Sequence, residues 1–253
     1  MSIGSDAEHR ALLAPYLIDG LLAGDRVIYF SHDYGDDIVR SYAADAGLAV
    51  DEYVDRGQLI IIPAVAAYLP EGRFDDLAML RTFGEQTQRA IDDGYRTLRA
   101  AGEMSWVLPN FVDERALVDY ELRADLATAP SRQIGLCIYD RRVTDARTLA
   151  SVAAVHASRL GELDMRPAVS VYGSGEGSVY IDGEVDLASA EFFVDVLQSI
   201  ASAIDEPALD LTRLEFIDVR GLREVARVAD ELARTGRRLT LSSPRAVVKR
   251  CVS

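Results

Sequence analysis

The chain has 253 residues, enough for two modest hydrophobic cores, and 49% of them are hydrophobic, which excludes a disordered chain. With 41 acidic against 27 basic residues the net charge is -14, so direct binding to a nucleic-acid backbone is not expected. No apolar run approaches the roughly 20 residues that span a bilayer, and no signal-peptide pattern is present, so we expect a cytoplasmic protein without membrane contact.

The first half of the chain alternates helical and strand patterns. Helices are predicted over 8–23, 35–46, 75–101, 113–127 and 144–160, and strands over 26–31, 58–63, 103–109 and 133–140. The strands are continuous apolar runs separated by helices, a pattern that indicates a parallel sheet covered on both faces. We therefore expect an α/β domain over residues 1–167.

A second, smaller β/α domain is predicted over residues 168–253. Its first strand leads into GSGEGS (173–178), whose glycines and serines predict a hairpin turn and not a long linker. The elements expected after that turn are a strand over 179–186, a helix over 188–203, a strand over 207–211, a helix over 221–235, a strand over 238–243 and a last helix from Pro244.

Four motifs follow one another in the second domain: GEVD (183–186), ALDLTRLEFID (208–218), GL (221–222) and RTGRRLTLSSP (234–244). Together they resemble the STAS family, the fold of anti-sigma-factor antagonists and of transporter regulatory tails. In that family the turn before the GL motif reads roughly D-S-S-G-L, and a partner kinase phosphorylates the second serine. The resemblance implies that this turn faces a protein partner, an anti-sigma factor or a kinase-like regulator.

In this chain the turn carries Arg220 where the family has its phospho-acceptor serine. Arginine has no hydroxyl group to phosphorylate, so we expect the serine switch to be absent. The residues expected to form the partner-binding surface are Asp218, Val219, Arg220, Gly221 and Arg223. Asp218 is also expected to cap the following helix, because a carboxylate there can accept free N–H groups. The alternative is an ordinary surface turn that tolerates any residue.

The first domain carries a longer series of motifs. They are PYLIDGLLAGDRVIYF (15–30), GQLIIIPAVAAYLPEGRFD (57–75), GYRTLRAAGEMSW (94–106), DYE (119–121) and LCIYD (136–140). In this order they resemble the MEDS family of sensory domains, which is similar to RecA/KaiC-like ATPase domains. Family members usually have a strand and a histidine before the first helix. Only MSIG precedes SDAEHR here, so we expect that this strand is lost or that the true start lies upstream.

The RecA-like resemblance suggests ATP, and the sequence argues against it. A phosphate-binding P-loop needs G-x-x-x-x-G-K-[ST]. The single lysine, Lys249, lies far from any strand-to-helix turn of the first domain, and residues 4–10 lack the glycine spacing. We therefore expect no P-loop ATPase and no bound cofactor. Two cysteines and three scattered histidines predict neither a disulfide framework nor a metal site.

Polar and aromatic residues near the ends of the predicted strands and on a neighbouring helix are the candidates for a ligand site, because parallel sheets bind ligands at the carboxyl ends of their strands. These candidates are His32, Asp33, Glu103, Trp106, Glu121, Cys137 and Tyr139. For Trp106 and Cys137 the alternative is an ordinary place in the core. No serine, cysteine or base is spaced to complete a catalytic triad.

We therefore predict a bacterial signalling regulator, in which a signal bound by the first domain changes how the second domain presents its surface to a partner. A small-molecule-modifying enzyme on the first domain is the alternative. A homodimer is a further possibility. It would use a stripe of residues on one side of the predicted long helix, provided that this stripe is wider than the contact of the helix with its own core requires. The stripe consists of Leu77, Leu80, Gly84, Thr87 and Ile91.

Overall fold

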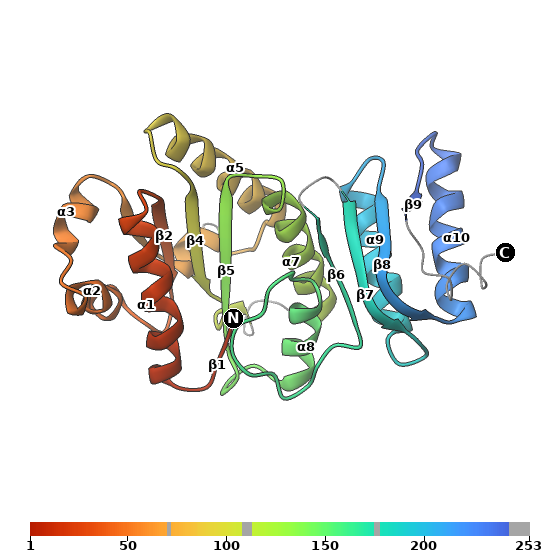
Figure 1. The fold of residues 1–253 in the computed structure, drawn as a ribbon, viewed down its shortest axis with the longest axis horizontal. Helices are drawn as coiled ribbons and strands as arrows, with labels where there is room; N and C mark the ends of the chain where they lie inside the picture. The colour runs from red at the N-terminus through yellow and green to blue at the C-terminus, as the bar shows by residue number, and fades with distance from the viewer. Residues whose placement is uncertain (70–71, 108–112, 175–177, 243–253) are drawn as a thin grey trace. The chain divides into compact units, whose positions relative to one another are not determined.

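The computed structural model describes residues 1–69, 72–107, 113–174 and 178–242, and contacts divide the chain into two compact units (Figure 1). The first unit comprises Met1–Val112, Arg132–Leu149 and Arg159–Leu163. The second comprises Asp113–Ser131, Ala150–Ser158 and Asp164–Ser253. Among the described residues, no helix is both long and apolar enough to cross a membrane.

The first unit contains a five-stranded sheet in the order β1-β5-β4-β2-β3, and every neighbouring pair is parallel. Its strands are β1 (Ser2–Ile3), β2 (Arg26–Ser31), β3 (Leu59–Pro63), β4 (Leu98–Glu103) and β5 (Gln133–Asp140). The prediction of a parallel sheet is confirmed. The two-residue strand β1 precedes the first helix and pairs with the end of β5.

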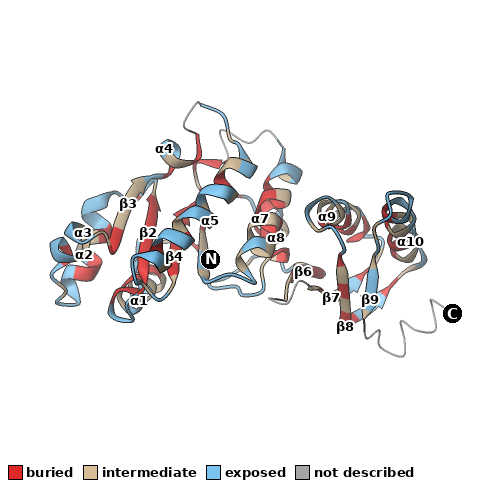
Figure 2. Ribbon diagram, turned by 90° about the horizontal axis from the view of Figure 1, so that it is seen from above, coloured by how far each residue is buried: buried red, intermediate tan, exposed pale blue. Residues whose placement is uncertain are grey.

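Helices cover both faces of this sheet (Figure 2). Successive side chains of the strand β2 point to opposite faces, and those of Val27 to Phe30 are all buried. Val27 and Tyr29 belong to the core cluster that includes α1, while Phe30 makes ring contacts with Tyr68 and Phe83, at 5.4 and 5.7 Å between centroids. The helices of the first unit are α1 (Asp6–Leu22), α2 (Asp36–Asp45), α3 (Val50–Asp55), α4 (Ala64–Tyr68) and α5 (Asp76–Asp92), while the boundary between the two units runs through α8 (Ala146–Ala154). The short helices α3 and α4 were not predicted.

The predicted helix over 75–101 and strand over 103–109 are wrong. The helix α5 ends at Asp92, before Gly94 with its positive φ of 86°, and β4 occupies Leu98–Glu103. The sequence LRAAGE looks helical because alanine and arginine favour helices. The segment forms a strand because it pairs with β2 on one side and with β5 on the other. The helix predicted over 144–160 is also shorter than expected, as α8 ends at Ala154.

The second unit contains a mixed four-stranded sheet in the order β6-β7-β8-β9. Its strands are β6 (Val169–Gly173), β7 (Ser178–Val185), β8 (Ala208–Ile217) and β9 (Thr240–Ser242), and its further helices are α9 (Ala190–Ala203) and α10 (Val219–Arg234). The pair β6–β7 is antiparallel, as a hairpin requires, and the other pairs are parallel; residues 175–177 of the predicted turn lie outside the described residues. The strand β8 runs past its predicted end at 211, and the helix predicted from Pro244 lies outside the described residues.

One helix of the second unit comes from the first half of the chain. The helix α7 (Glu114–Thr128) follows β4 in sequence and precedes β5, yet its contacts place it with the STAS-like sheet. It packs against α9 and β6, and α9 in turn packs against α10.

Candidate functional site

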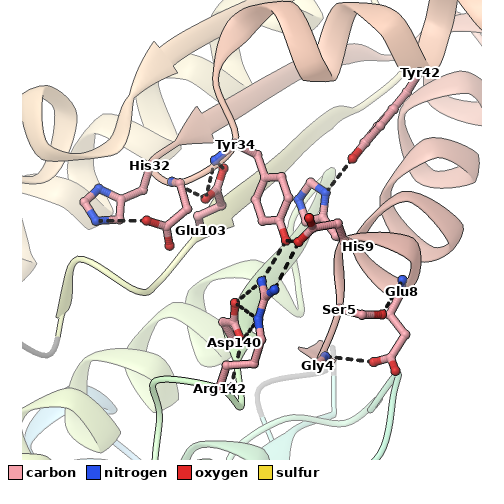
Figure 3. A network of polar contacts seen from close by, with 12 residues as sticks. Gly4, Ser5, Glu8, His9, His32, Tyr34, Tyr42, Glu103, Asp140 and Arg142 are labelled. Atoms are coloured by element: carbon pink, nitrogen blue, oxygen red, sulfur yellow. Dashed lines mark hydrogen bonds and ion pairs between the residues drawn. The ribbon is translucent and has the colours of Figure 1, made fainter.

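Buried polar side chains meet at the carboxyl edge of the first sheet, where β2 and β4 end (Figure 3). The hydroxyl of Tyr29 donates to Glu103 Oε1 at 2.5 Å. The imidazole of His9 has its Nε2 3.1 Å from the Tyr29 hydroxyl and its Nδ1 3.0 Å from the Tyr42 hydroxyl. His9 and Tyr29 are fully buried and Glu103 is 2% exposed, so these groups depend on one another for hydrogen bonds.

Glu103 is the acceptor at the centre of this network. Besides the Tyr29 hydroxyl, it accepts from the backbone N–H of Asp33 at 2.6 Å and of Tyr34 at 3.1 Å. These two N–H groups belong to the loop that follows β2, so the carboxylate ties that loop to the end of β4. In each of these contacts the carboxyl group of Glu103 is the acceptor.

The direction of the hydrogen bonds follows from the role of Glu103 as acceptor. Since Tyr29 gives its proton to the carboxylate, its oxygen accepts from His9, which must carry its proton on Nε2. The His9 Nδ1 then accepts from Tyr42. The result is a one-way chain of hydrogen bonds from Tyr42 through His9 and Tyr29 to Glu103.

Burial controls the ionisation of these groups. Desolvation lowers the pKa of His9 to about 4, so the imidazole is neutral at neutral pH. Burial raises the pKa of Glu103, and the hydrogen bonds from Tyr29 and the backbone oppose that shift. The pKa of Tyr34 is raised to about 12, first by burial and then by its hydrogen bond to Asp6.

A charged rim borders the buried network. Arg142 donates to Asp140 Oδ2 at 2.6 Å, to Asp6 Oδ1 at 3.1 Å and to the Tyr34 hydroxyl at 3.0 Å. The side chain of Arg142 is 45% exposed, so solvent and solutes reach it. The Tyr34 ring stacks on His9 with centroids 3.6 Å apart, and this contact joins the rim to the buried network.

The N-terminus of α1 lies at the same edge and is capped by its own side chains. The Ser5 hydroxyl accepts from the Glu8 N–H at 3.2 Å, and Glu8 Oε2 accepts from the Gly4 N–H at 2.8 Å. A P-loop would offer its backbone N–H groups to phosphate at this strand-to-helix turn. The carboxylates of Asp6 and Glu8 stand there and would repel a phosphate, which supports the prediction that this turn is no P-loop.

The turn at the start of α10 is built around Asp218. This residue is the N-cap, and its Oδ1 accepts from the Gly221 N–H at 2.8 Å, which confirms the predicted cap. Gly221 is buried, and a Cβ on it would lie 2.8 Å from side-chain atoms of Ile217 and Val185. The first turn of α10 therefore packs directly on the ends of β7 and β8.

Apolar and basic side chains are exposed at this end of the STAS-like sheet. Leu187 is 72% exposed, Val219 63% and Phe216 43%, and the two arginines of the turn are exposed as well. We call this set the α10-start surface: Leu187, Phe216, Val219, Arg220 and Arg223. Large apolar side chains exposed near the start of α10 are candidates for contact with a partner.

A family model described as the MEthanogen/methylotroph, DcmR Sensory domain, or MEDS, matches residues 1–157. The chain belongs to the MEDS family. A STAS domain model matches residues 171–253, so a MEDS domain is followed by a STAS domain. The comparison with curated proteins returned no match. Sensory and STAS domains are typically non-catalytic, and their combination indicates a signalling or sensory regulator.

Three of the seven residues predicted for a ligand site lie at the carboxyl edge of the MEDS sheet. Glu103 accepts from the Asp33 N–H, as described above, and His32 Nε2 lies 3.8 Å from Asp33 Oδ1. The Asp33 and His32 side chains are 52% and 31% exposed, so they extend the charged rim.

The other four candidates have different surroundings. Trp106 is fully buried in the turn after β4, in an aromatic cluster with Tyr68 and Phe74 at 4.8 and 5.8 Å between centroids. Cys137 and Tyr139 are on β5, the first half-buried and the second buried.

Glu121, the last candidate, is fully buried on α7 in the second unit, 3.3 Å from His156. Burial alone would lower the pKa of His156, but the hydrogen bond and charge of Glu121 outweigh it and raise that pKa.

Most of the network was not predicted from the sequence. The missed residues are Asp6, His9, Tyr29, Tyr34, Tyr42, Asp140 and Arg142. The rule that pointed to His32 and Asp33, polar residues directly after a strand, applies equally to Asp140 and Arg142 and would have found them. No sequence signal marks His9, because a histidine in the first turns of a helix looks like a surface residue.

Proposed function

We propose that this protein is a sensory regulator. Its MEDS domain senses a small molecule at the carboxyl edge of its sheet, and its STAS domain binds a protein partner, an anti-sigma factor or kinase-like regulator, through the surface around Asp218–Arg223. The observation that carries the proposal is the α10-start surface, which exposes three large apolar side chains and two arginines around a capped helix start.

The composition of this surface supports a protein partner. Apolar side chains and arginine are enriched in protein interfaces, and the interface core is depleted of other charges. Asp218 holds the backbone of the turn, so Val219 and Arg220 are presented from a rigid helix start. The partner should offer an apolar patch with acidic residues near Arg220 and Arg223.

The partner interaction should not depend on phosphorylation of this turn. Arg220 has no hydroxyl group, and the hydroxyl groups of Ser189 and Thr212 do not lie on this turn. Ser189 is buried and its hydroxyl contacts the carbonyl oxygen of Glu184, while Thr212 lies within β8, before the turn. The STAS domain is therefore proposed to be regulated by the MEDS domain and not by a kinase acting on this turn.

The rim of the MEDS network supports the sensory part of the proposal. Arg142 is exposed and holds Asp140, Asp6 and Tyr34 together. A small molecule that bears a carboxylate or another polar acceptor could replace one of these contacts, because the guanidinium is a strong multidentate donor. Its binding would then change the contacts of Tyr34, whose ring stacks on His9.

The partner proposal is tested with the variant Arg220→Glu. A partner is captured from the host with the wild-type chain, and its affinity for both chains is measured by calorimetry. The variant should fold normally, since an anion at a helix N-terminus stabilises the helix by about 0.3–1 kcal/mol. Its affinity should fall roughly tenfold or more, because a charge at the interface is reversed. Arg238→Glu makes the same change on an exposed arginine beyond the other end of α10 and should bind normally. Equal affinity of Arg220→Glu and wild type, or a phosphate found on this turn, would contradict the proposal.

The sensory proposal is tested by thermal shift with a panel of nucleotides and one-carbon metabolites. A compound that the protein senses should raise the melting temperature without being consumed, and Arg142→Ala should lose that shift. Arg89→Ala, which removes an exposed arginine from α5, should retain it. Turnover of the compound would instead support an enzyme on the MEDS domain.

A further inference from the structure

The carboxylate of Asp6 lies where two hydrogen-bond donors of the charged rim converge. Asp6 Oδ1 accepts from the Tyr34 hydroxyl at 2.8 Å and from Arg142 Nη1 at 3.1 Å. Asp6 is the first residue of α1, and its side chain is 78% exposed. One oxygen atom at the surface of the MEDS domain is therefore held by donors that follow two different strands, β2 and β5.

Both donors are held in place by contacts that do not involve Asp6. Tyr34 is 7% exposed, and its ring stacks on the buried His9 with an angle of 5° between the two planes. Arg142 donates to the carboxylate of Asp140 through Nε at 2.9 Å and through Nη2 at 2.6 Å. Its Nη2 also donates to the Tyr34 hydroxyl at 3.0 Å, which ties the two donors to each other. They would therefore keep their positions if the Asp6 side chain turned away.

The Asp6 side chain is the part of this arrangement that can leave. An exposed ion pair contributes little to stability, because water solvates both charges once they separate. Donors that are already oriented bind a new acceptor with little further loss of conformational freedom. The Tyr34 hydroxyl and Arg142 Nη1 thus provide a preformed place for one acceptor oxygen, and in this structure the chain's own carboxylate fills it. The place lies at the carboxyl edge of a parallel sheet, where such sheets bind ligands.

The charges around this place favour a carboxylate over a phosphate. A ligand carboxylate that replaces the carboxylate of Asp6 leaves the charge beside Arg142 unchanged. A phosphate monoester carries about 1.5–2 negative charges at neutral pH, so it would add negative charge beside Asp140. Asp140 is buried, and solvent and salt screen a buried charge poorly. The exchange of one carboxylate for another therefore has the smaller electrostatic cost.

We propose that Tyr34 and Arg142 form the carboxylate subsite of the sensed compound, and that Asp6 competes with the compound for this subsite. The compound is an organic acid whose carboxylate displaces that of Asp6. This inference rests on the proposed function, since it names the chemical class of the small molecule and the residue that opposes its binding. A competitor that fills the subsite about nine-tenths of the time lowers the apparent affinity roughly tenfold, so Asp6 sets the concentration at which the compound is sensed.

The variant Asp6→Ala tests the competition, with sodium formate as the probe. The substitution deletes a carboxylate group and leaves the two donors, so formate can take the place of the deleted group. The apparent Kd is obtained from the rise in melting temperature of the full chain, with sodium chloride keeping the ionic strength constant. Asp6→Ala should bind formate roughly tenfold more tightly than the wild type. Asp6→Asn keeps an acceptor oxygen in the subsite and should respond as the wild type does.

Two controls show whether formate binds at the rim. Asp76→Ala makes the same change at the first residue of α5 and should respond as the wild type does. Adding Arg142→Ala to Asp6→Ala should abolish the response to formate, whereas adding Arg89→Ala should leave it unchanged.

The proposal is overturned if Asp6→Ala binds formate no more tightly than the wild type, or if adding Arg142→Ala leaves the affinity of Asp6→Ala unchanged. Either result is distinguishable from a failure of the sensory proposal, because a compound without a carboxylate could still raise the melting temperature of the wild-type chain in the metabolite panel. The test also involves no protein partner, so it leaves the partner proposal unaffected.

Discussion

The variant Tyr29→Phe tests the buried hydrogen-bond chain of the MEDS domain. It deletes one oxygen and keeps the ring, so the packing of the core is preserved. The hydroxyl donates to the carboxyl group of Glu103 at 2.5 Å, and a hydrogen bond to a carboxylate is worth about 1.5–3 kcal/mol. The deletion also leaves His9 Nε2 buried without this partner, which costs about 1–3 kcal/mol. Both effects arise from the loss of the same hydroxyl oxygen, so they do not simply add. We expect a loss of about 3 kcal/mol in the free energy of unfolding.

The assay uses Trp106, the single tryptophan of the chain, which is fully buried in the first unit. Its fluorescence in a urea titration therefore follows the unfolding of that unit alone, which matters because a two-domain chain need not unfold in one step. The urea midpoint of Tyr29→Phe should fall while the slope of the transition stays the same.

The control variant is Tyr95→Phe. Its hydroxyl donates to the carbonyl oxygen of Arg56 at 3.0 Å in an exposed setting, where water can replace the bond. We expect it to lose less than about 1 kcal/mol. If Tyr29→Phe loses no more than Tyr95→Phe, the buried chain does not contribute to stability and our account of the network is wrong.

Gly221→Ala should lose about 1–3 kcal/mol of unfolding free energy by circular dichroism, because its Cβ overlaps buried side chains, whereas Gly84→Ala in open space on α5 should gain up to about 1 kcal/mol. Histidine resonances followed by NMR against pH should show His9 titrating near 4 and His156 above 6.5, and common titration of both near 6.5 would contradict the environments described. The stability due to His9 should be lost as the pH falls from 6.5 through about 4, whereas that due to His156, paired with Glu121, should be lost as the pH rises through its raised pKa.

The homodimer stays a prediction. The structure shows which residues of the proposed stripe on α5 are exposed and which are buried. On α5, Leu77 is 51% exposed and Gly84 is exposed. Thr87 is buried and donates to Gln133, so it does not belong to an exposed stripe. Light scattering at high concentration would decide between a mass near 27.7 kDa for the monomer and twice that value.

Several elements of the fold follow from local sequence patterns. The strand β5 occupies residues 133–140 as predicted, because a run of apolar residues between polar flanks suits a strand in a parallel sheet. The cap by Asp218 also follows from local chemistry, since a carboxylate before a helix accepts the free N–H groups of its first turn. The sequence alone also shows that residue 220 is an arginine, so this position of the turn has no hydroxyl group.

Other features depend on contacts between distant parts of the chain. The run LRAAGE favours a helix locally, and it becomes β4 because it pairs with β2 and β5, which come from distant parts of the chain. The hydrogen bonds of Tyr29 join it to His9, 20 residues away, and to Glu103, 74 residues away. Sequence periodicity records which face of an element is buried, but not which side chains of other elements meet it there. Only the tertiary structure could therefore place a histidine of α1 between two tyrosines and α7 beside the STAS domain.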